Sequence, residues 1–509
     1  MNIKTHLTKT IASSWFSLIV TSICQLVMIP VALAVLSKAD FALYAIITQL
    51  LMAVMLAEIG ARSACARLLI DARVKGKDAY DRMWVASVCV YCVQALLMLI
   101  IILAVAPFLA ELFHLAPEES QLARSIFIVV GLINTANYVF SILATALLAG
   151  QRLNQINMYG AISMVLQMIV FILALKMGAG LWAYPIALVS STLCTQILSL
   201  ILALKHNLVG HFSFALFSWI EMKEVFSLGF DVFVAAMFSM VMGNSLLILS
   251  GHLLTLEQTA ILAINLKLVS MMTQILQRIP GSASPILMQL VSEGKNPQFG
   301  KWWEFVTKMT ISMALLAAGM FILWNKAVVS AWTSPDMVMP LASVALLSLI
   351  PFRYLVHYQF VNTLTVYKEI RKVKLMLVWE IVLYISLAYG LGKAFGLNGL
   401  LAANILSMLG GALIGGMKWF AVFSEIPVRR QVVLLSKLTL PLVLSFAILS
   451  LAGERLLNDG IIGTATLSLI WGAVFTAIGY FVLLNDAERD SFWKILNSLR
   501  KHRLSKVKI

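Results

Sequence analysis

Charge is scarce in this sequence. Asp, Glu, Lys and Arg together make up 12% of its 509 residues, whereas soluble domains carry about 25%. Hydrophobic residues make up 61%, and the mean hydropathy is +0.93. This composition excludes an ordinary soluble domain and a disordered chain, and it predicts an integral membrane protein that crosses the bilayer many times.

Residues for nucleotide, metal and redox chemistry are also lacking. The glycine-lysine pairs at 300–301 and 392–393 have neither the earlier glycine nor the following Ser or Thr of a P-loop. The seven histidines show no metal-ligand spacing. Among the five cysteines, Cys89 and Cys92 form a C-x-x-C inside an apolar run, which favours packing over redox use. We therefore expect no metal, no cofactor and no nucleotide hydrolysis by the P-loop route.

Long apolar runs are what the sequence has instead. A helix needs about 20 apolar residues to cross a bilayer, and fourteen runs of about that length are present. Gly-rich turns at 178–180 and at 396 divide two of the longest blocks. We thus predict an all-α integral membrane fold of about fourteen transmembrane helices. The runs lie near residues 11–36, 41–61, 83–110, 123–149, 156–177, 181–204, 228–251, 257–291, 305–331, 338–366, 373–395, 397–420, 432–453 and 461–484.

The positions of lysine and arginine predict the orientation. With the N-terminus in the cytoplasm, 28 of these 38 residues lie at or beside the cytoplasmic termini and connections, against six on the other side. Cytoplasmic connections are enriched in Lys and Arg, and one missed span would invert the bias. We predict that both termini are cytoplasmic, so the net charge of +15 reflects topology and not nucleic-acid binding. The most charged connection, 62–82, is expected to be a loop that lies against anionic membrane lipids.

An internal repeat predicts two halves. The segment SKADFALYAIITQL at 37–50 aligns with TLEQTAILAINLKL at 255–268 at an offset of 218, and two shorter segments align at offsets of 217 and 219. Parallel repeats of this kind place the substrate site between two pseudo-symmetric lobes, here spans 1–6 and 7–12. The predicted parts are an N-terminal six-helix lobe at 1–218, a C-terminal six-helix lobe at 219–430, an extra transmembrane helix pair at 431–485 and a basic cytoplasmic tail at 486–509.

The stretch 257–290 carries charge in an otherwise apolar segment. On a helix, Lys267, Gln274 and Arg278 share one stripe, since eleven residues come within about 20° of three full turns. A charge at mid-bilayer costs about 3 kcal/mol unless it faces a partner or a water-filled cavity. We therefore predict that this stripe binds an anionic substrate, with snorkelling to the headgroups as the alternative for Arg278. The prolines at 280–285 are expected to interrupt the helix.

Arg353 is a second deep cation and a predicted substrate-binding residue. Glu380, in the next span, lies at a depth that allows the two side chains to pair. Two interpretations remain open. The pair is either a static link between two spans or a contact that opens when an anion competes for the arginine.

Three further charged residues are candidates for gating or ion coupling, together with Glu380. Glu58 and Arg62 are spaced i, i+4 near the cytoplasmic end of the second span, where they form either a gate pair or an ordinary interfacial ion pair. Asp231 lies at the expected start of the seventh span, where it either caps the helix or binds a cation.

One segment resembles a known family. The stretch SKADFALYAIITQLLMAVMLAEIGARSACAR, with its acidic-aromatic turn at 40–44 and Gly60 at the span end, is similar to the first-span and second-span signature of the multidrug/oligosaccharidyl-lipid/polysaccharide exporter superfamily, in its polysaccharide branch. In the second half, LEQTAILAINLKL followed by P-x-x-x-x-P at 280–285 resembles the equivalent element, and GLNGLLAAN at 396–404 resembles the opening of span 12.

The resemblance implies a function. Such proteins are flippases of the Wzx type, or O-antigen translocases, which are not enzymes. They move undecaprenyl-diphosphate-linked oligosaccharide from the cytoplasmic to the periplasmic leaflet of the bacterial inner membrane by alternating access. The two phosphates of that substrate suit a cationic interior. The resemblance also implies a polysaccharide polymerase and a chain-length regulator as candidate protein partners.

Three other functions are weighed against this one. A lipid II flippase would share the fourteen spans and the basic cavity. A multidrug/cation antiporter of the same superfamily would have twelve spans and an acidic cavity. A membrane-embedded glycosyltransferase or polymerase would need a large outer loop with catalytic residues, and no predicted outer connection exceeds about a dozen residues. The glycan, the coupling ion and the oligomeric state are left open by the sequence.

Overall fold

The structure is a computed structural model of the full chain. It describes residues 3–58, 60–115, 117–294, 296–367, 369–452 and 460–479. Within these residues the chain forms helices and no strand, so the predicted all-α fold is confirmed. Ten helices in the described part are long and apolar enough to cross a membrane, and a shorter apolar helix covers Ile462–Ile478. Each of the fourteen predicted spans falls largely or partly on helical backbone, which agrees with a count of about fourteen.

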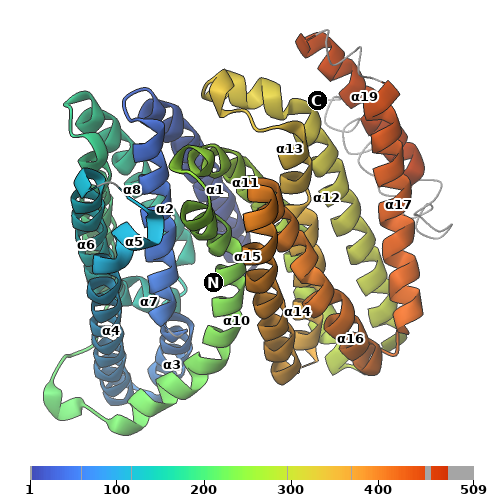
Figure 1. The fold of residues 1–509 in the computed structure, drawn as a ribbon. Helices are drawn as coiled ribbons and strands as arrows, with labels where there is room; N and C mark the ends of the chain where they lie inside the picture. The colour runs from blue at the N-terminus through green and yellow to red at the C-terminus, as the bar shows by residue number, and fades with distance from the viewer. Residues whose placement is uncertain are drawn as a thin grey trace, which may run out of the picture. The chain divides into compact units, whose positions relative to one another are not determined.

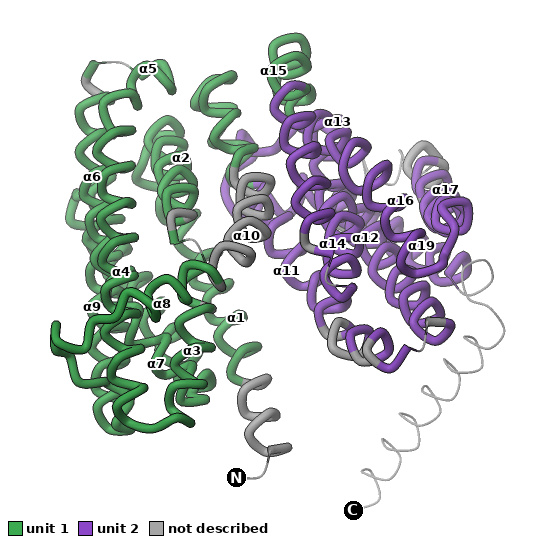
Figure 2. Tube along the Cα trace, turned by 90° about the horizontal axis from the view of Figure 1, so that it is seen from below, with its two compact units in different colours: residues 1–264, 387–400 green, residues 265–386, 401–509 purple. Residues whose placement is uncertain are grey.

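The chain folds into two compact units, shown in green and purple in Figure 2. Unit 1 contains residues 1–264 and 387–400, and unit 2 contains 265–386 and 401–509. The predicted six-helix lobes and the extra helix pair rest on the sequence repeat and stay a prediction. The predicted basic tail at 486–509 lies outside the described residues.

Unit 1 is a bundle in which α8 packs along α1 and α9, while α10 packs along α2, α3 and α4 (Figure 1). Its helices are α1 (Ile3–Leu33), α2 (Lys38–Val54), η1 (Met55–Glu58), α3 (Ala61–Lys75), α4 (Lys77–Val105), η2 (Ala106–Phe108), α5 (Leu109–Phe113), α6 (Pro117–Phe140), α7 (Ile142–Ala149), α8 (Leu153–Lys176), η3 (Gly180–Trp182), α9 (Ala183–Lys205), η4 (Phe214–Leu216) and α10 (Trp219–Leu253).

Unit 2 is built around α12, which packs against α13, α14, α17 and α19. The helix α11 begins in unit 1 and continues through unit 2, and α15 contributes to both units. The remaining elements are α11 (Leu256–Ser292), α12 (Asn296–Trp332), η5 (Pro335–Met337), α13 (Leu341–Ser348), α14 (Ile350–Val366), α15 (Ile370–Met408), the π-helix η6 (Leu409–Gly416), α16 (Met417–Ser424), α17 (Val428–Ala452) and α19 (Gly460–Ile478).

Glycine turns divide the long apolar blocks where the sequence predicts. Gly396, with φ 56° and ψ −134°, breaks α15 into two spans. Gly178 and Gly180 have φ of 82° and 55° in the turn between α8 and α9. Only glycine adopts such angles at little cost, which is why these positions end one span and begin the next.

The predicted loop at 62–82 is wrong. Most of this connection is the helix α3, followed by the first turns of α4. Its apolar residues recur at helical spacing, and Cys65, Leu69 and Ala72 are buried against the rest of unit 1. The cations between them stay on the outer face, so charge density alone did not distinguish a loop from an amphipathic helix.

The prolines at 280–285 do not end α11, so the expected interruption is also wrong. A proline removes one backbone donor and crowds the preceding turn. In a membrane helix the freed carbonyl can be satisfied by neighbouring groups, and the helix then continues.

The sequence repeat has a structural counterpart at two helix starts. Ser37 and Asp40 form a reciprocal capping box at the start of α2. At the start of α11, the Gln258 amide donates to Thr255 Oγ1 at 3.2 Å and the Thr255 amide donates to Gln258 Oε1 at 3.4 Å. Both boxes satisfy otherwise unpaired helix donors in the same way. The aligned positions therefore begin equivalent helices.

Candidate functional site

The predicted cation stripe lies on α11. Lys267 is half-buried, whereas Gln274 and Arg278 are exposed. The opposite face carries Val269 and Leu276, which are buried in unit 2. No carboxylate forms an ion pair with Lys267 among the residues that the structure describes. The stripe therefore presents polar and cationic groups on the side of α11 that faces away from the core of unit 2.

Arg353, His357 and Glu380 form a buried cluster inside unit 2. Arg353 and His357 are one turn apart on α14, and Glu380 faces them from α15. Arg353 Nη2 donates to Glu380 Oε1, and His357 Nδ1 lies 2.6 Å from Glu380 Oε2. The three residues are 2%, 6% and 0% exposed. Glu380 thus neutralises the arginine, and the pairing that the sequence allowed is present.

The π-helix η6 covers this cluster. A Cβ added to Gly411 would lie 2.8 Å from Cβ and Oε2 of Glu380 and 2.9 Å from the carbonyl oxygen of Met376. Glycine at 411 therefore lets the η6 backbone pack directly on the carboxylate. π-Helical turns are rare and are frequently found at functional sites. The sequence LGGALIGG contains the glycines, but spacing alone did not predict this contact.

The structure does not place Arg353 on the α11 stripe. The side of α14 that packs on α11 carries Leu355, which lies in one apolar cluster with Leu276. Tyr354 hydrogen-bonds the side chain of Gln277 on the same side. Since Arg353 turns instead toward α15, the two groups of predicted substrate-binding cations are separate in this structure.

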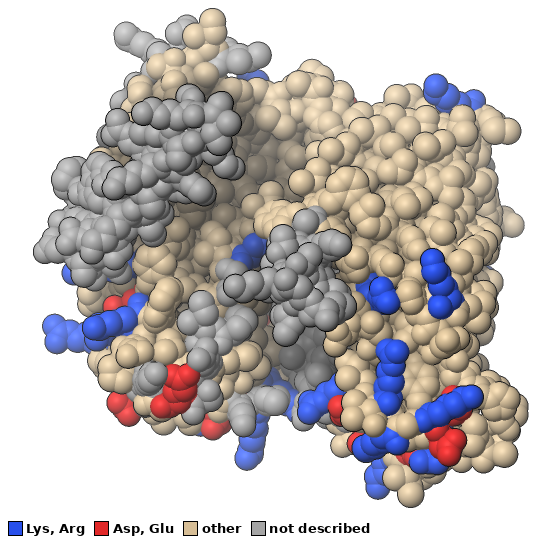
Figure 3. All heavy atoms as spheres, turned by 180° about the vertical axis from the view of Figure 1, so that it is seen from behind, with Lys and Arg blue, Asp and Glu red and all other residues tan. Residues whose placement is uncertain are grey.

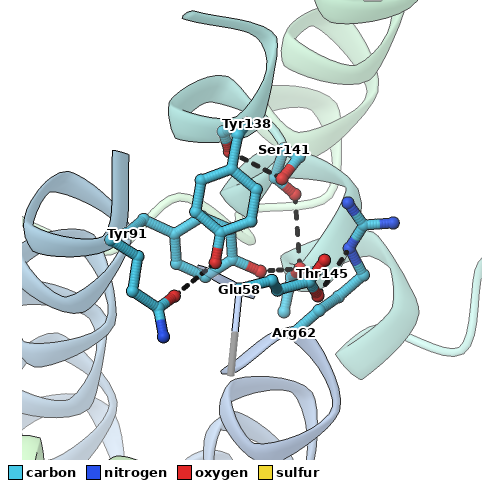
Figure 4. Close-up of polar contacts among 7 residues, drawn as sticks. Glu58, Arg62, Tyr91, Tyr138, Ser141 and Thr145 are labelled. Carbon is cyan, nitrogen blue, oxygen red and sulfur yellow. Dashed lines mark hydrogen bonds and ion pairs between the residues drawn. The ribbon is translucent and has the colours of Figure 1, made fainter. Parts of the chain in front are cut away.

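Glu58 and Arg62 lie together in unit 1, as Figure 4 shows. Arg62 Nε is 3.6 Å from Glu58 Oε1, and the two side chains are 51% and 26% exposed. Gly60, with φ 66°, lies between η1 and α3 and so turns the chain at this point. Exposed pairs of this kind contribute little to stability, so the pair alone does not distinguish a gate from an ordinary ion pair.

A buried polar network lies beside Glu58, and sequence reasoning missed it. The rings of Tyr91 and Tyr138 stack with centroids 4.8 Å apart. The Tyr138 hydroxyl donates to Gln94 Oε1, and the Tyr91 hydroxyl lies 2.7 Å from Thr145 Oγ1 (Figure 4). All four residues are at most 1% exposed. Tyrosine and glutamine spaced by three residues in an otherwise apolar run were the available signal.

Asp231 is not a helix cap. The helix α10 begins at Trp219, twelve residues earlier, and Asp231 lies inside it. The prediction placed the helix start at the beginning of the apolar run, but α10 starts in the more polar sequence before it. The side chains of 228–244 lie outside what the structure describes, so ion coupling by Asp231 stays a prediction.

Charged side chains are unevenly distributed over the surface. In Figure 3 the blue and red side chains visible on this face lie mostly toward the lower end of the view, beside a broad tan area. On unit 1, apolar side chains such as Ile169 and Ile197 are 47% and 54% exposed along α8 and α9. This pattern is typical of helices that face lipid.

The comparisons with known proteins agree with this architecture. The sequence profile of a family described as polysaccharide biosynthesis protein matches residues 7–291. No curated protein matches the chain significantly.

Three solved structures share the fold. One is a multidrug resistance MATE family transporter of the MOP superfamily in an inward-facing conformation. It is 14% identical in sequence, with a TM-score of 0.64, and the match covers 80% of this chain and 96% of the transporter. The lipid II flippase MurJ, in an inward closed conformation, is 13% identical with a TM-score of 0.63, covering 92% and 98%. A eukaryotic MATE transporter is 16% identical with a TM-score of 0.57, covering 84% and 98%.

Proposed function

Because the chain belongs to the family of polysaccharide biosynthesis proteins, we propose that it is a transporter that flips a lipid-linked oligosaccharide across the membrane by alternating access. The proposed substrate is an undecaprenyl-diphosphate-linked O-antigen or related polysaccharide repeat unit. It moves from the cytoplasmic to the periplasmic leaflet of the bacterial inner membrane, and both termini of the protein are cytoplasmic. A fold shared with a lipid II flippase supports this class of substrate.

Lys267 is the observation that carries the proposal. It is half-buried on a 37-residue helix, and no described carboxylate pairs with it. Retaining such a cation within an apolar segment is costly unless it meets an anion or water. A diphosphate supplies the opposite charge, and charge-assisted hydrogen bonds to phosphate are stronger than neutral ones. Gln274 and Arg278 extend the same polar stripe toward the end of the span.

The other predicted residues take different proposed roles. Arg353 binds substrate only when its bond to Glu380 opens, since in this structure Glu380 already neutralises it. Glu380, with His357 on its second oxygen, is a proposed ion-coupling group. Glu58 and Arg62 form a proposed gate pair, and Asp231 is a further candidate for coupling.

The test is export of the glycan in a host whose own copy of the gene is deleted. Lys267→Ala is expected to reduce surface glycan by at least about tenfold, because one charge-assisted contact contributes more than about 1.4 kcal/mol. Lys267→Arg keeps the charge and is expected to retain partial export. Lys326→Ala, which removes an exposed lysine on α12, serves as the control.

Protein in the membrane is measured by immunoblot beside every export assay. A fall in export without a fall in protein supports the proposal. Normal export by both Lys267→Ala and Arg353→Ala would contradict it.

A lipid II flippase is the second candidate. The solved lipid II flippase covers 92% of this chain, against 80% for the multidrug transporter of similar TM-score. The two candidates carry a similar lipid diphosphate but different sugars. Rescue of growth after depletion of the host's lipid II flippase would favour the second candidate, and rescue of surface glycan alone would favour the first.

A further inference from the structure

A cavity in unit 1 is lined by two arginines. It has a volume of about 430 Å³. Arg73 comes from the last turn of α3, and Arg152 follows the turn 149–151 that joins α7 to α8. Ile70 and Val74 complete the lining from α3.

The turn that carries Arg152 is held in place by packing. A Cβ on Gly150 would lie 2.7 Å from Leu208, so only glycine fits there without movement. The carbonyl of Leu208 accepts a hydrogen bond of 2.7 Å from the Tyr80 hydroxyl. Leu208 is 2% exposed. The turn is therefore fixed against α4 and the segment after α9, so this end of the cavity is preformed.

The Arg152 guanidinium is oriented but not neutralised. Its Nη2 donates to Nδ1 of His206 at 3.3 Å. Desolvation, together with the nearby Arg152 and Lys205, lowers the pKa of His206 from its usual range. The imidazole therefore stays neutral and accepts the hydrogen bond, so Arg152 keeps its full charge.

Neither arginine has a carboxylate partner in the described part of the chain. Other cations of unit 1 do, since Arg82 pairs with Glu221 at 3.5 Å and Lys38 pairs with Glu257 at 2.8 Å. The exposed Arg73 and the half-buried Arg152 therefore line one cavity with two positive charges that no described carboxylate neutralises. A phosphate group matches this geometry because each guanidinium can donate two parallel hydrogen bonds to it.

Two exposed apolar side chains also line the cavity. Ile70 is 41% exposed and Val74 is 86% exposed beside the two arginines. A soluble phosphate ester gains nothing from such side chains, whereas the glycerol backbone and first methylenes of a lipid do, at about 0.8 kcal/mol for each buried CH₂. The combination of two arginines with exposed apolar side chains is thus better matched to a lipid than to a soluble ligand.

We propose that the cavity between the end of α3 and the start of α8 binds the phosphate of a membrane lipid, held by Arg73 and Arg152 with its glycerol region against Ile70 and Val74. The three segments involved, around residues 73, 152 and 206, all belong to connections that the lysine and arginine distribution predicts to be cytoplasmic. The occupant is therefore a lipid of the cytoplasmic leaflet. This site goes beyond the proposed transport function and does not depend on it.

The test uses the full-length protein in detergent and native mass spectrometry with dioleoyl phosphatidylglycerol. One adduct that survives gentle activation is expected for the unmodified protein. Arg73→Gln combined with Arg152→Gln is expected to weaken that adduct by about tenfold or more, since two charge-assisted bonds are lost. The matched control is Lys75→Gln combined with Lys77→Gln, which removes the same charge from neighbouring exposed positions outside the cavity and is expected to change binding by less than about twofold.

Two further ligands test whether the site binds a lipid phosphate or a soluble phosphate ester. Dioleoylglycerol, which has the chains without the phosphate, is expected not to form the adduct, and glycerol 1-phosphate is expected not to displace the lipid. Val74→Glu puts a carboxylate at an exposed position of the cavity lining, where folding is expected to stay intact, and it is expected to weaken the adduct as the arginine variants do. The assignment would be overturned if the double arginine variant and the double lysine control lost the lipid adduct equally. Displacement of the lipid by glycerol 1-phosphate would also overturn it.

Discussion

Lys38 Nζ lies 2.8 Å from Glu257 Oε1, and this ion pair joins the first turns of α2 and α11. These two helices begin with equivalent capping boxes in the two copies of the sequence repeat. The pair is partly exposed, at 30% and 63%, so it contributes little to stability. Because it contributes little, the Lys38–Glu257 pair can form and break at low cost. We therefore interpret it as a latch, meaning an ion pair between equivalent helices that opens and closes during the transport cycle.

Reversing one charge of this latch should impair transport. Lys38→Glu or Glu257→Lys places like charges at the two helix starts, which disfavours the arrangement seen here, and we expect export to fall a few-fold. Exchanging both charges should restore export, whereas Lys393→Glu, at an exposed lysine of α15, should have little effect. Export is measured as surface glycan. A double exchange that is no better than either single reversal would argue against a latch.

The buried cluster of unit 2 should show strong coupling in stability. Glu380→Leu leaves the guanidinium of Arg353 buried without its partner, which costs about 3–5 kcal/mol. We expect a large fall in apparent melting temperature in detergent. Adding Arg353→Met should recover most of the loss, since apolar replacements of a buried pair are often tolerated.

The same double variant distinguishes the two interpretations of the pair. If Arg353 and Glu380 only link α14 and α15, the restored protein should export glycan. If they bind substrate or couple an ion, the restored protein should be stable but inactive. Loss of stability in the double variant equal to the sum of the two single losses would mean that the pair is not coupled at all.

Gly411 should tolerate no side chain. Gly411→Val puts atoms within about 3 Å of the Glu380 carboxylate and the Met376 carbonyl, and overpacking of this kind costs about 1–3 kcal/mol. Gly390, on α15, has nothing within 4 Å of an added Cβ, so Gly390→Val is the matched control. Thermal unfolding of both variants checks the prediction. Equal melting temperatures would show that η6 can move away from the carboxylate without cost.

Removing a hydroxyl group from the tyrosine network beside Glu58 should destabilise the protein. Tyr138→Phe removes the donor to Gln94, whose side-chain nitrogen already lacks a partner among the described residues. Leaving a buried amide unsatisfied costs about 1–3 kcal/mol. We expect a lower melting temperature, with Gln94→Leu in the Tyr138→Phe background recovering part of it, because the unpaired amide is then gone. No recovery would mean that Gln94 has another role.

The length of the apolar runs was sufficient to locate the spans, because the thickness of the bilayer fixes how many apolar residues a helix needs to cross it. A helix that crosses hydrocarbon needs about 20 predominantly apolar residues, so the runs and the glycine turn at Gly396 could be located without coordinates. The repeat could be found for a related reason, since Ser37 and Thr255 both satisfy helix donors that have no other partner. The stripe of Lys267, Gln274 and Arg278 follows from helical spacing alone.

The tertiary structure decided which charges meet. Nothing local distinguishes Arg353, which turns to Glu380 and is neutralised, from Lys267, which pairs with no described carboxylate. Arg73 and Arg152 lie 79 positions apart in the sequence, and the packing of α3 and the turn 149–151 brings them to one cavity. Insertion into lipid depends on the composition of each segment by itself, whereas charge pairing depends on distances of a few ångströms between segments, and these are determined by the packing of the helices.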